Sequence, residues 1–236
     1  MRTDRTYDAV FWDVGGVILN IPSISRGQRA FVERAVDRYD LDDAPEAALE
    51  RWRDGMREHF ADRENGEYRT ARGARRRGAE TLFDGDPPAD WQTLHQAAMD
   101  DHREPNPGAI ETITALGEAG VYQAIVSDAD EEGIPEMLDR FDIADHVSHV
   151  TTSEAVGYTK PDQRMFETAL AKADVDPARG IMIGDKYRND MEGGTEAGLA
   201  TVAYGAEDGP AVDYRIEDLR ELLDIVGVGG GLDSSQ

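Results

Sequence analysis

Short runs of apolar residues recur along the chain, and each run is followed by small or polar residues. This pattern constrains the fold more than any other feature of the sequence. The runs are Ala9–Trp12, Tyr122–Val126, His146–Val150, Ile181–Ile183 and Ala200–Ala203. Between them lie segments with helical spacing of apolar residues, such as Pro107–Ala119 and Pro161–Ala173. Because buried strands alternate with amphipathic helices, the sequence predicts an α/β protein with a doubly wound parallel sheet.

One long segment, residues 21–105, interrupts this rhythm. It is rich in Arg, Glu and Ala, has no convincing strand, and its spacing predicts helices over about 27–39, 44–61, 66–83 and 89–102. Pro105 and Pro107 then mark the return to the alternating pattern. We therefore expect a core formed by residues 1–20 plus 106–236, with an all-helical unit over 21–105 inserted after the first strand.

The chain is strongly acidic. It has 236 residues and a formal net charge of −24, with three lysines among 25 basic residues. Nucleic acid and anionic membrane surfaces attract basic proteins, so neither is an expected partner. Abundant acids and scarce lysines resemble proteins that live in very high salt, where screening weakens repulsion between surface charges. We interpret the charge as an adaptation to the solvent.

Cysteine is absent from the sequence, which excludes disulfides, thiolate nucleophiles and cysteine metal ligands. The sequence also shows neither a signal-peptide pattern nor an apolar stretch approaching the roughly 18 residues of a membrane span. A cytoplasmic location is the expectation that follows.

Polar residues follow the apolar runs at the points where strands are expected to end. They are Asp13, Ser127, Asp128, Lys160, Asp185 and Asp190. Strand ends of a parallel sheet meet at one edge, where Asp13 and Asp185 would repel each other unless a cation lay between them. Mg²⁺ prefers such oxygen ligands.

A phosphate group brought to that ion needs hydrogen-bond donors on its other oxygens. The Ser127 hydroxyl and the Lys160 ammonium supply them, and the Asp13 carboxylate is then able to attack phosphorus. Taken singly, each residue is more typical of a turn, a helix cap or a surface position. The order of the whole set indicates a site.

The set resembles the motifs of the haloacid dehalogenase (HAD) superfamily, in the subgroup with a helical cap after the first strand. The resembling stretches are FWDVGGVIL, IVSD, TKPD and IGDKYRND. The resemblance covers nearly the whole chain and implies a Rossmann-like core, Mg²⁺ dependence and phosphomonoester hydrolysis. By position, it makes Asp13 the nucleophile and a metal ligand, and Ser127 a phosphate-binding residue. It likewise implies that Lys160 steadies both the nucleophile and the phosphate, that Asp185 binds metal, and that Asp190 supports the metal.

The sequence departs from this pattern at Gly15. Most HAD phosphatases carry a second Asp at this position, which protonates the leaving alcohol and later activates water. The backbone carbonyl of Gly15 is still a candidate metal ligand, but the general acid/base is missing, and such catalysis is worth about 10²–10⁴-fold. Asp128, which we also count among the candidate substrate-binding residues, is a replacement acid by sequence position only. We expect slow turnover or a substrate with a better leaving group.

Two other functions remain open. The 2-haloacid dehalogenase branch of the superfamily also lacks the second Asp, but it does not usually keep the metal-binding Asp that Asp185 matches, so Asp185 favours phosphate chemistry. A non-catalytic ligand-binding or regulatory protein is the third alternative. The expected partner is a small phosphorylated molecule, and the sequence predicts no oligomeric state.

Arginines are concentrated in the inserted segment. They are Arg51, Arg53, Arg57, Arg63, Arg69, Arg72 and Arg75–Arg77. They are either a screen for anionic substrates or surface partners of Glu58, Glu64, Glu67 and Glu80; we favour the second interpretation. Trp52, Phe60 and Trp91 are expected in the core of the inserted unit.

Overall fold

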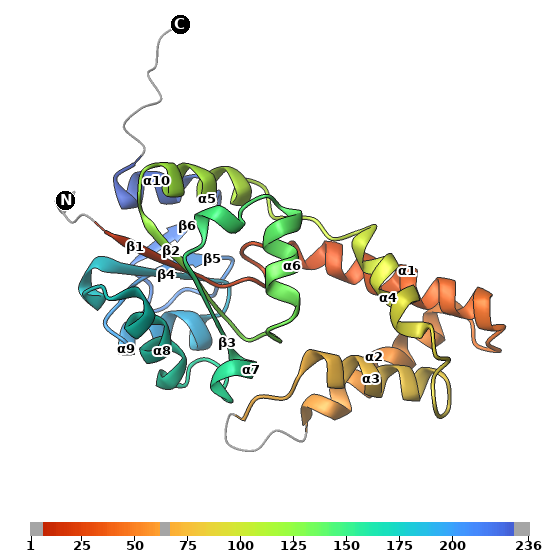
Figure 1. The fold of residues 1–236 in the computed structure, drawn as a ribbon. Coiled ribbons are helices and arrows are strands. Elements are labelled where there is room, and N and C mark those ends of the chain that lie inside the picture. The colour runs from red at the N-terminus through yellow and green to blue at the C-terminus, as the bar shows by residue number, and fades with distance from the viewer. Residues whose placement is uncertain (1–6, 62–66, 229–236) are drawn as a thin grey trace, which may run out of the picture. The chain divides into compact units, whose positions relative to one another are not determined.

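A single parallel sheet organises the larger part of the chain. The structure is a computed structural model that describes residues 7–61 and 67–228. Its six strands lie in the order β3-β2-β1-β4-β5-β6, all parallel, which confirms the predicted doubly wound α/β fold (Figure 1). The strands are β1 (Ala9–Trp12), β2 (Tyr122–Ser127), β3 (His149–Thr152), β4 (Gly180–Gly184), β5 (Ala200–Tyr204) and β6 (Tyr214–Ile216).

Strand β1 lies at the centre of the sheet, and all four of its residues are buried. It pairs with β2 on one side and β4 on the other, so that Trp12 lies opposite Ile125 and Ile183. The strand order reverses between β1 and β4, and doubly wound folds bind their ligands at such a point. Residues directly after β1 and β4 therefore meet at the same edge.

Helices cover both faces of the sheet (Figure 1). Helices α5 (Ala109–Glu118) and α10 (Glu221–Val226) lie on one face, and α8 (Gln163–Ala173) and α9 (Gly193–Glu196) on the other. Met165 and Phe166 of α8 pack with Phe11 of β1 in one buried cluster. The remaining core helices are α6 (Gly133–Arg140) and the short α7 (Ser153–Val156).

Leu19–Glu104 forms a second compact unit, separate from the core unit of residues 1–18 and 105–236. Its helices are α1 (Ile21–Tyr39), α2 (Pro45–Ala61), α3 (Ala71–Leu82) and α4 (Trp91–Asp100). Its centre is an apolar cluster that contains Phe31, Trp52 and Trp91, all at most 4% exposed. Phe31 contacts both indoles edge-on or tilted. Phe60 is only half-buried.

Several element boundaries differ from the sequence prediction. Helix α1 begins at Ile21 rather than near residue 27, because the Asn20 side chain caps Ser23 N–H at 3.0 Å and Pro22 suits the first turn. Helix α3 begins at Ala71 rather than near residue 66, because Thr70 is its N-cap and accepts the backbone N–H of Gly73. Strand β3 begins at His149 because residues 144–146 form a 3-10 turn, and the short strand β6 was not predicted. None of the described helices is both long and apolar enough to span a lipid bilayer.

Candidate active site

Asp13 lies directly after β1, at the edge where the parallel strands end. Its backbone N–H donates to the carbonyl of Ile183 at 3.0 Å, which extends the β1–β4 pairing by one residue. The side chain is 6% exposed, so this carboxylate is held inside the core unit. Burying a charge is costly unless it is paired, and Asp13 is paired with Lys160.

Asp185 comes directly after β4 and lies against Gly16. Gly16 has a φ of 86°, which favours glycine. A β-carbon on this residue would lie 2.1 Å from Asp185 Oδ2. Gly16 thus lets Asp185 approach the strand edge closely.

The loop after Asp13 is also held by the buried side chain of Asn106, whose Nδ2 donates to the carbonyls of Gly16 at 2.8 Å and Val17 at 2.9 Å. Asn106 follows Pro105 at the point where the chain returns to the core, and its role was not predicted from the sequence.

Asp190 lies in a π-helix, Tyr187–Glu192, and is fully buried. Its Oδ2 accepts the backbone N–H of Lys186 at 3.0 Å. A β-carbon on Gly184 would lie 2.2 Å from the β-carbon of Asp190. The glycine at the end of β4 therefore leaves the space that Asp190 occupies.

Lys160 joins two of these carboxylates. Its Nζ lies 2.9 Å from Asp13 Oδ1 and 2.6 Å from Asp190 Oδ1, and its side chain is 2% exposed. Burial alone would lower the pKa of Lys160, but the charges of Asp13, Asp190 and Asp128 outweigh it and raise that pKa above its ordinary value. Lys160 is consequently a fixed cation at neutral pH.

Carboxylate oxygens of Asp13, Asp185 and Asp190 lie within 4.8 Å of one another. Burial and then the charge of Asp13 raise the pKa of Asp185 to about 6. Burial also raises the pKa of Asp190, although Lys160 opposes this. Lys160 offsets one of three negative charges, and Asp185 Oδ1 is buried without a hydrogen-bond donor among the described residues. Three clustered carboxylates with an unsatisfied oxygen fit a hard divalent cation such as Mg²⁺.

A pocket of about 480 Å³ opens beside Asp185. It is lined by Gly16, Asp185, Tyr204, Gly205, Arg215, Ile216 and Glu217. Solvent therefore reaches Asp185 through a pocket that residues of β5 and β6 help to line.

Ser127 is the last residue of β2 and is 4% exposed, at the same strand edge as Asp13. Asp128 follows it but is occupied by other residues: Oδ1 accepts from Ser153 Oγ and from the Lys160 backbone N–H, each at 2.8 Å. Gly15 lies half-buried in the loop after Asp13. The structure thus brings Asp13, Lys160, Asp185 and Asp190 together, while roles for Ser127, Asp128 and Gly15 in binding stay predictions.

A family model described as haloacid dehalogenase-like hydrolase matches residues 7–198. The chain belongs to the haloacid dehalogenase-like hydrolase family. The resemblance carried by the four motifs is thereby confirmed, and the solved HAD phosphatase of Thermococcus onnurineus has the same fold. That structure covers 93% of this chain and 98% of its own, with a TM-score of 0.71 at 23% identity.

Curated relatives of the chain include several phosphatases. The ribulose-1,5-bisphosphate 5-phosphatase of Halopiger xanaduensis is 30% identical over 92% of this chain and 98% of its own length. The glyceraldehyde 3-phosphate phosphatase of Pyrococcus furiosus is 31% identical over 54% of this chain and 56% of its own length. Other matched relatives are covered over only about half of their length: the chain covers 43% of the haloacid dehalogenase-like hydrolase domain-containing protein 3 of Bos taurus, at 35% identity, and 58% of the phosphoglycolate phosphatase of Agrobacterium fabrum, at 30% identity.

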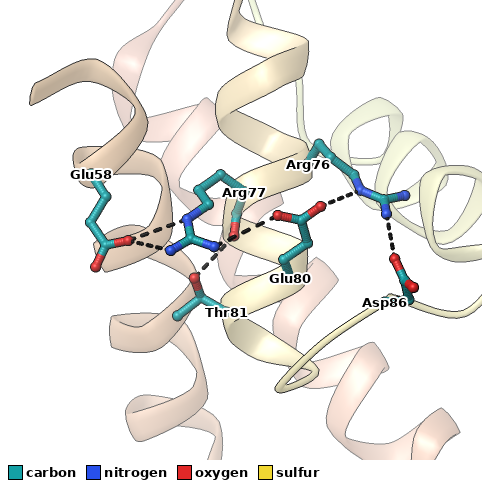
Figure 2. Close-up of polar contacts among 6 residues, drawn as sticks. All are labelled: Glu58, Arg76, Arg77, Glu80, Thr81 and Asp86. Carbon is teal, nitrogen blue, oxygen red and sulfur yellow. Dashed lines mark hydrogen bonds and ion pairs between the residues drawn. The ribbon is translucent and has the colours of Figure 1, made fainter. Parts of the chain in front are cut away.

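Arginines of the inserted unit are largely paired with carboxylates. Figure 2 shows two of them on α3: Arg76 lies 2.8 Å from both Glu80 and Asp86, and Arg77 lies 2.9 Å from Glu58. Arg51 and Arg57 likewise each contact two acidic side chains. These contacts support the interpretation of the arginines as surface partners. Arg63 and Glu64 lie outside the described residues.

Proposed function

We propose that this hydrolase is a Mg²⁺-dependent phosphatase that acts on a small phosphorylated metabolite through an aspartyl-phosphate at Asp13. The observation that carries the proposal is the cluster of Asp13, Asp185 and Asp190, in which the buried Lys160 bridges Asp13 and Asp190. A carboxylate aligned by Lys160 beside a divalent-cation site is suited to attack phosphorus. The phosphatase relatives support a small phosphorylated substrate.

Asp13 and Lys160 have complementary roles in the proposed reaction. Lys160 holds Asp13 Oδ1 at 2.9 Å, which leaves the other carboxylate oxygen to form the new P–O bond while the ester P–O bond breaks. The departing oxygen takes a proton from water, because Gly15 supplies no acid at the usual position. A second water then attacks phosphorus, releases inorganic phosphate and restores the Asp13 carboxylate. We therefore expect the fastest turnover with leaving groups of low pKa.

Asp13, Asp185 and Asp190 would hold the Mg²⁺, with the Gly15 carbonyl as a further ligand. A bound ion would neutralise part of the negative charge of the phosphate. Ser127 would donate its hydroxyl to the phosphate. The inserted unit, Leu19–Glu104, is proposed to act as the cap that selects the substrate.

Dehalogenation of a 2-haloacid is the second candidate, because Gly15 replaces the acid that phosphatases use. Dehalogenation needs no metal, so it does not explain why Asp185 Oδ1 is buried without a hydrogen-bond donor among the described residues. Phosphate chemistry accounts for Asp185, and we favour it for that reason. A non-catalytic ligand-binding protein would keep the metal site without turnover.

The test is a hydrolysis screen in molar KCl, chosen for the acidic composition of the chain. Substrates are para-nitrophenyl phosphate, acetyl phosphate and sugar phosphates with Mg²⁺, and chloroacetate with EDTA. Asp13→Asn and Asp185→Asn are the control variants. We expect phosphate release that both substitutions abolish. Chloride release in EDTA would establish the dehalogenase instead, and silence on every substrate would favour a binding protein.

A further inference from the structure

Asp128 connects three segments of the candidate active site. Its Oδ1 accepts from the backbone N–H of Lys160 and from Ser153 Oγ, both at 2.8 Å. Its Oδ2 accepts from Asn189 Nδ2 at 3.1 Å. Helix α7, the loop that carries Lys160 and the π-helix are therefore tied to one carboxylate, which directly follows β2.

Each donor bound by Asp128 lies beside a group of the site. The Lys160 backbone is fixed by Asp128, while its ammonium bridges Asp13 and Asp190. Asn189 immediately precedes Asp190, whose carboxylate is the other end of that bridge. Asp128 is thus bonded to the backbone of Lys160 and to the residue that immediately precedes Asp190.

We propose that Asp128 is a positioning residue and not the missing general acid. It fixes the positions of Lys160 and Asp190 relative to each other, through its hydrogen bonds to the Lys160 backbone and to the Asn189 side-chain amide. The inference rests on the proposed function for its kinetic consequences. Three donors point at this carboxylate and each requires an acceptor. Both oxygens of Asp128 are therefore occupied by hydrogen bonds within the protein.

The reciprocal exchange Asp128→Asn plus Asn189→Asp tests the pairing. With the neighbouring side chains placed as observed, Asp128→Asn puts two amide donors opposite each other across the 3.1 Å contact. Asn189→Asp puts two carboxylate acceptors there. In the exchange, the new amide at position 128 donates to the new carboxylate at position 189, and the amide oxygen still accepts from the Lys160 N–H and Ser153. The exchange also keeps the net charge of the chain. Ser153→Ala is the matched control, because it removes one bond of Asp128 and leaves its links to Lys160 and Asn189.

We expect each single variant to lower kcat about tenfold or more, with KM changed less than about twofold, since a charge-assisted hydrogen bond is lost. The exchange should recover kcat to within about threefold of wild type, and Ser153→Ala should change it less than about threefold. If the exchange is as slow as the product of the two single losses, the pairing does not position the site. Full activity of Asp128→Asn would also overturn the proposal.

A second readout does not depend on turnover. The chain has only three lysines, so acetylation by acetic anhydride can be followed at each by mass spectrometry. Lys160 is buried and Lys186 is exposed, so Lys186 calibrates the reagent. We expect Lys160 to react at least about tenfold faster in both single variants and to be protected again in the exchange. If Lys160 is equally protected in all variants, the positioning role is wrong, even should the wild-type protein hydrolyse no phosphate.

Discussion

Lys160 and Asp190 form an ion pair that is almost completely excluded from solvent: Nζ lies 2.6 Å from Oδ1, and the side chains are 2% and 0% exposed. Removing one member of such a pair leaves an uncompensated charge in the interior. In this site the consequence is larger, because Lys160 also faces Asp13 at 2.9 Å.

We expect Lys160→Met to destabilise the metal-free protein by about 3–5 kcal/mol and to abolish phosphate release. Denaturant unfolding in molar KCl measures the first effect. Lys172→Met is the control, because Lys172 is bonded to the backbone of Val150 and not to a carboxylate of the site. Equal unfolding midpoints for the Lys160 variant and wild type would show that the pair contributes nothing.

Gly16 permits the close approach of Asp185, and Gly16→Ala should therefore weaken Mg²⁺ binding. A β-carbon at residue 16 would lie 2.1 Å from Asp185 Oδ2, so the carboxylate must move. Gly120→Ala is a matched control: Gly120 has a φ of 76°, close to the 86° of Gly16, but no neighbouring atom within 4 Å of an added β-carbon.

Both alanine variants should lose about 1 kcal/mol of stability from backbone strain. Only Gly16→Ala should lower Mg²⁺ affinity, by about tenfold or more, in a calorimetric titration. Equal Mg²⁺ affinity of the two variants would contradict the role assigned to Gly16.

The sequence predicted the fold and most of the grouping, for a physical reason. Buried runs such as Ala9–Trp12 must be strands of a parallel sheet, and parallel strands end at one edge, so Asp13 and Asp185 had to meet there. Lys160 was placed in the same set by its order along the chain.

Contacts that depend on backbone placement were beyond prediction. Asn106 lies far along the chain from the Gly16 loop that it holds, and its hydrogen bonds follow only from the folded path. The hydrogen bond from Asn189 to Asp128 likewise depends on the π-helix, which has no simple periodic signal, and the bond from Ser153 depends on where α7 lies in the fold. Strand β6 was missed because Tyr214–Ile216 is too short for alternation to be recognised.

Asp185 should make the metal-free protein more stable as the pH falls. Its pKa is raised to about 6 in the folded state, above the ordinary value of 3.8. Between these values the folded protein binds more protons than the unfolded chain, so this group costs stability as pH rises through the window. Because Asp185 is only partly buried, we expect an effect of about 1 kcal/mol.

The measurement is the unfolding free energy at pH 4.5 and 7 in EDTA, taken as the difference between wild type and Asp185→Asn. The variant should lose this component of the pH dependence. Mg²⁺ affinity should show the opposite trend in wild type, rising from pH 5 to 7, because the ion binds the ionised carboxylate. Identical pH profiles in EDTA for the two proteins would refute the assignment.

The arginine pairs of α3 should contribute little to stability or substrate binding. The side chains of Arg76 and Arg77 are 48% and 49% exposed, and exposed ion pairs contribute about 0–1 kcal/mol. We expect the combined Arg76→Gln and Arg77→Gln variant to keep the KM for any anionic substrate that the wild type hydrolyses. A KM raised tenfold or more would revive the interpretation of these residues as an anion screen.

Salt should stabilise the protein strongly. A net charge of −24 on 236 residues produces self-repulsion in dilute buffer, and molar salt reduces the Debye length to roughly 3 Å. We expect Tm to rise by roughly 5–10 °C or more between 0.05 and 2 M KCl, measured in EDTA so that metal binding does not contribute. Tetramethylammonium chloride is the control, since pure screening predicts the same rise at equal ionic strength. An unchanged Tm in both salts would mean that the acidic surface is not an adaptation to salt, and a rise in KCl alone would indicate specific K⁺ binding instead of screening.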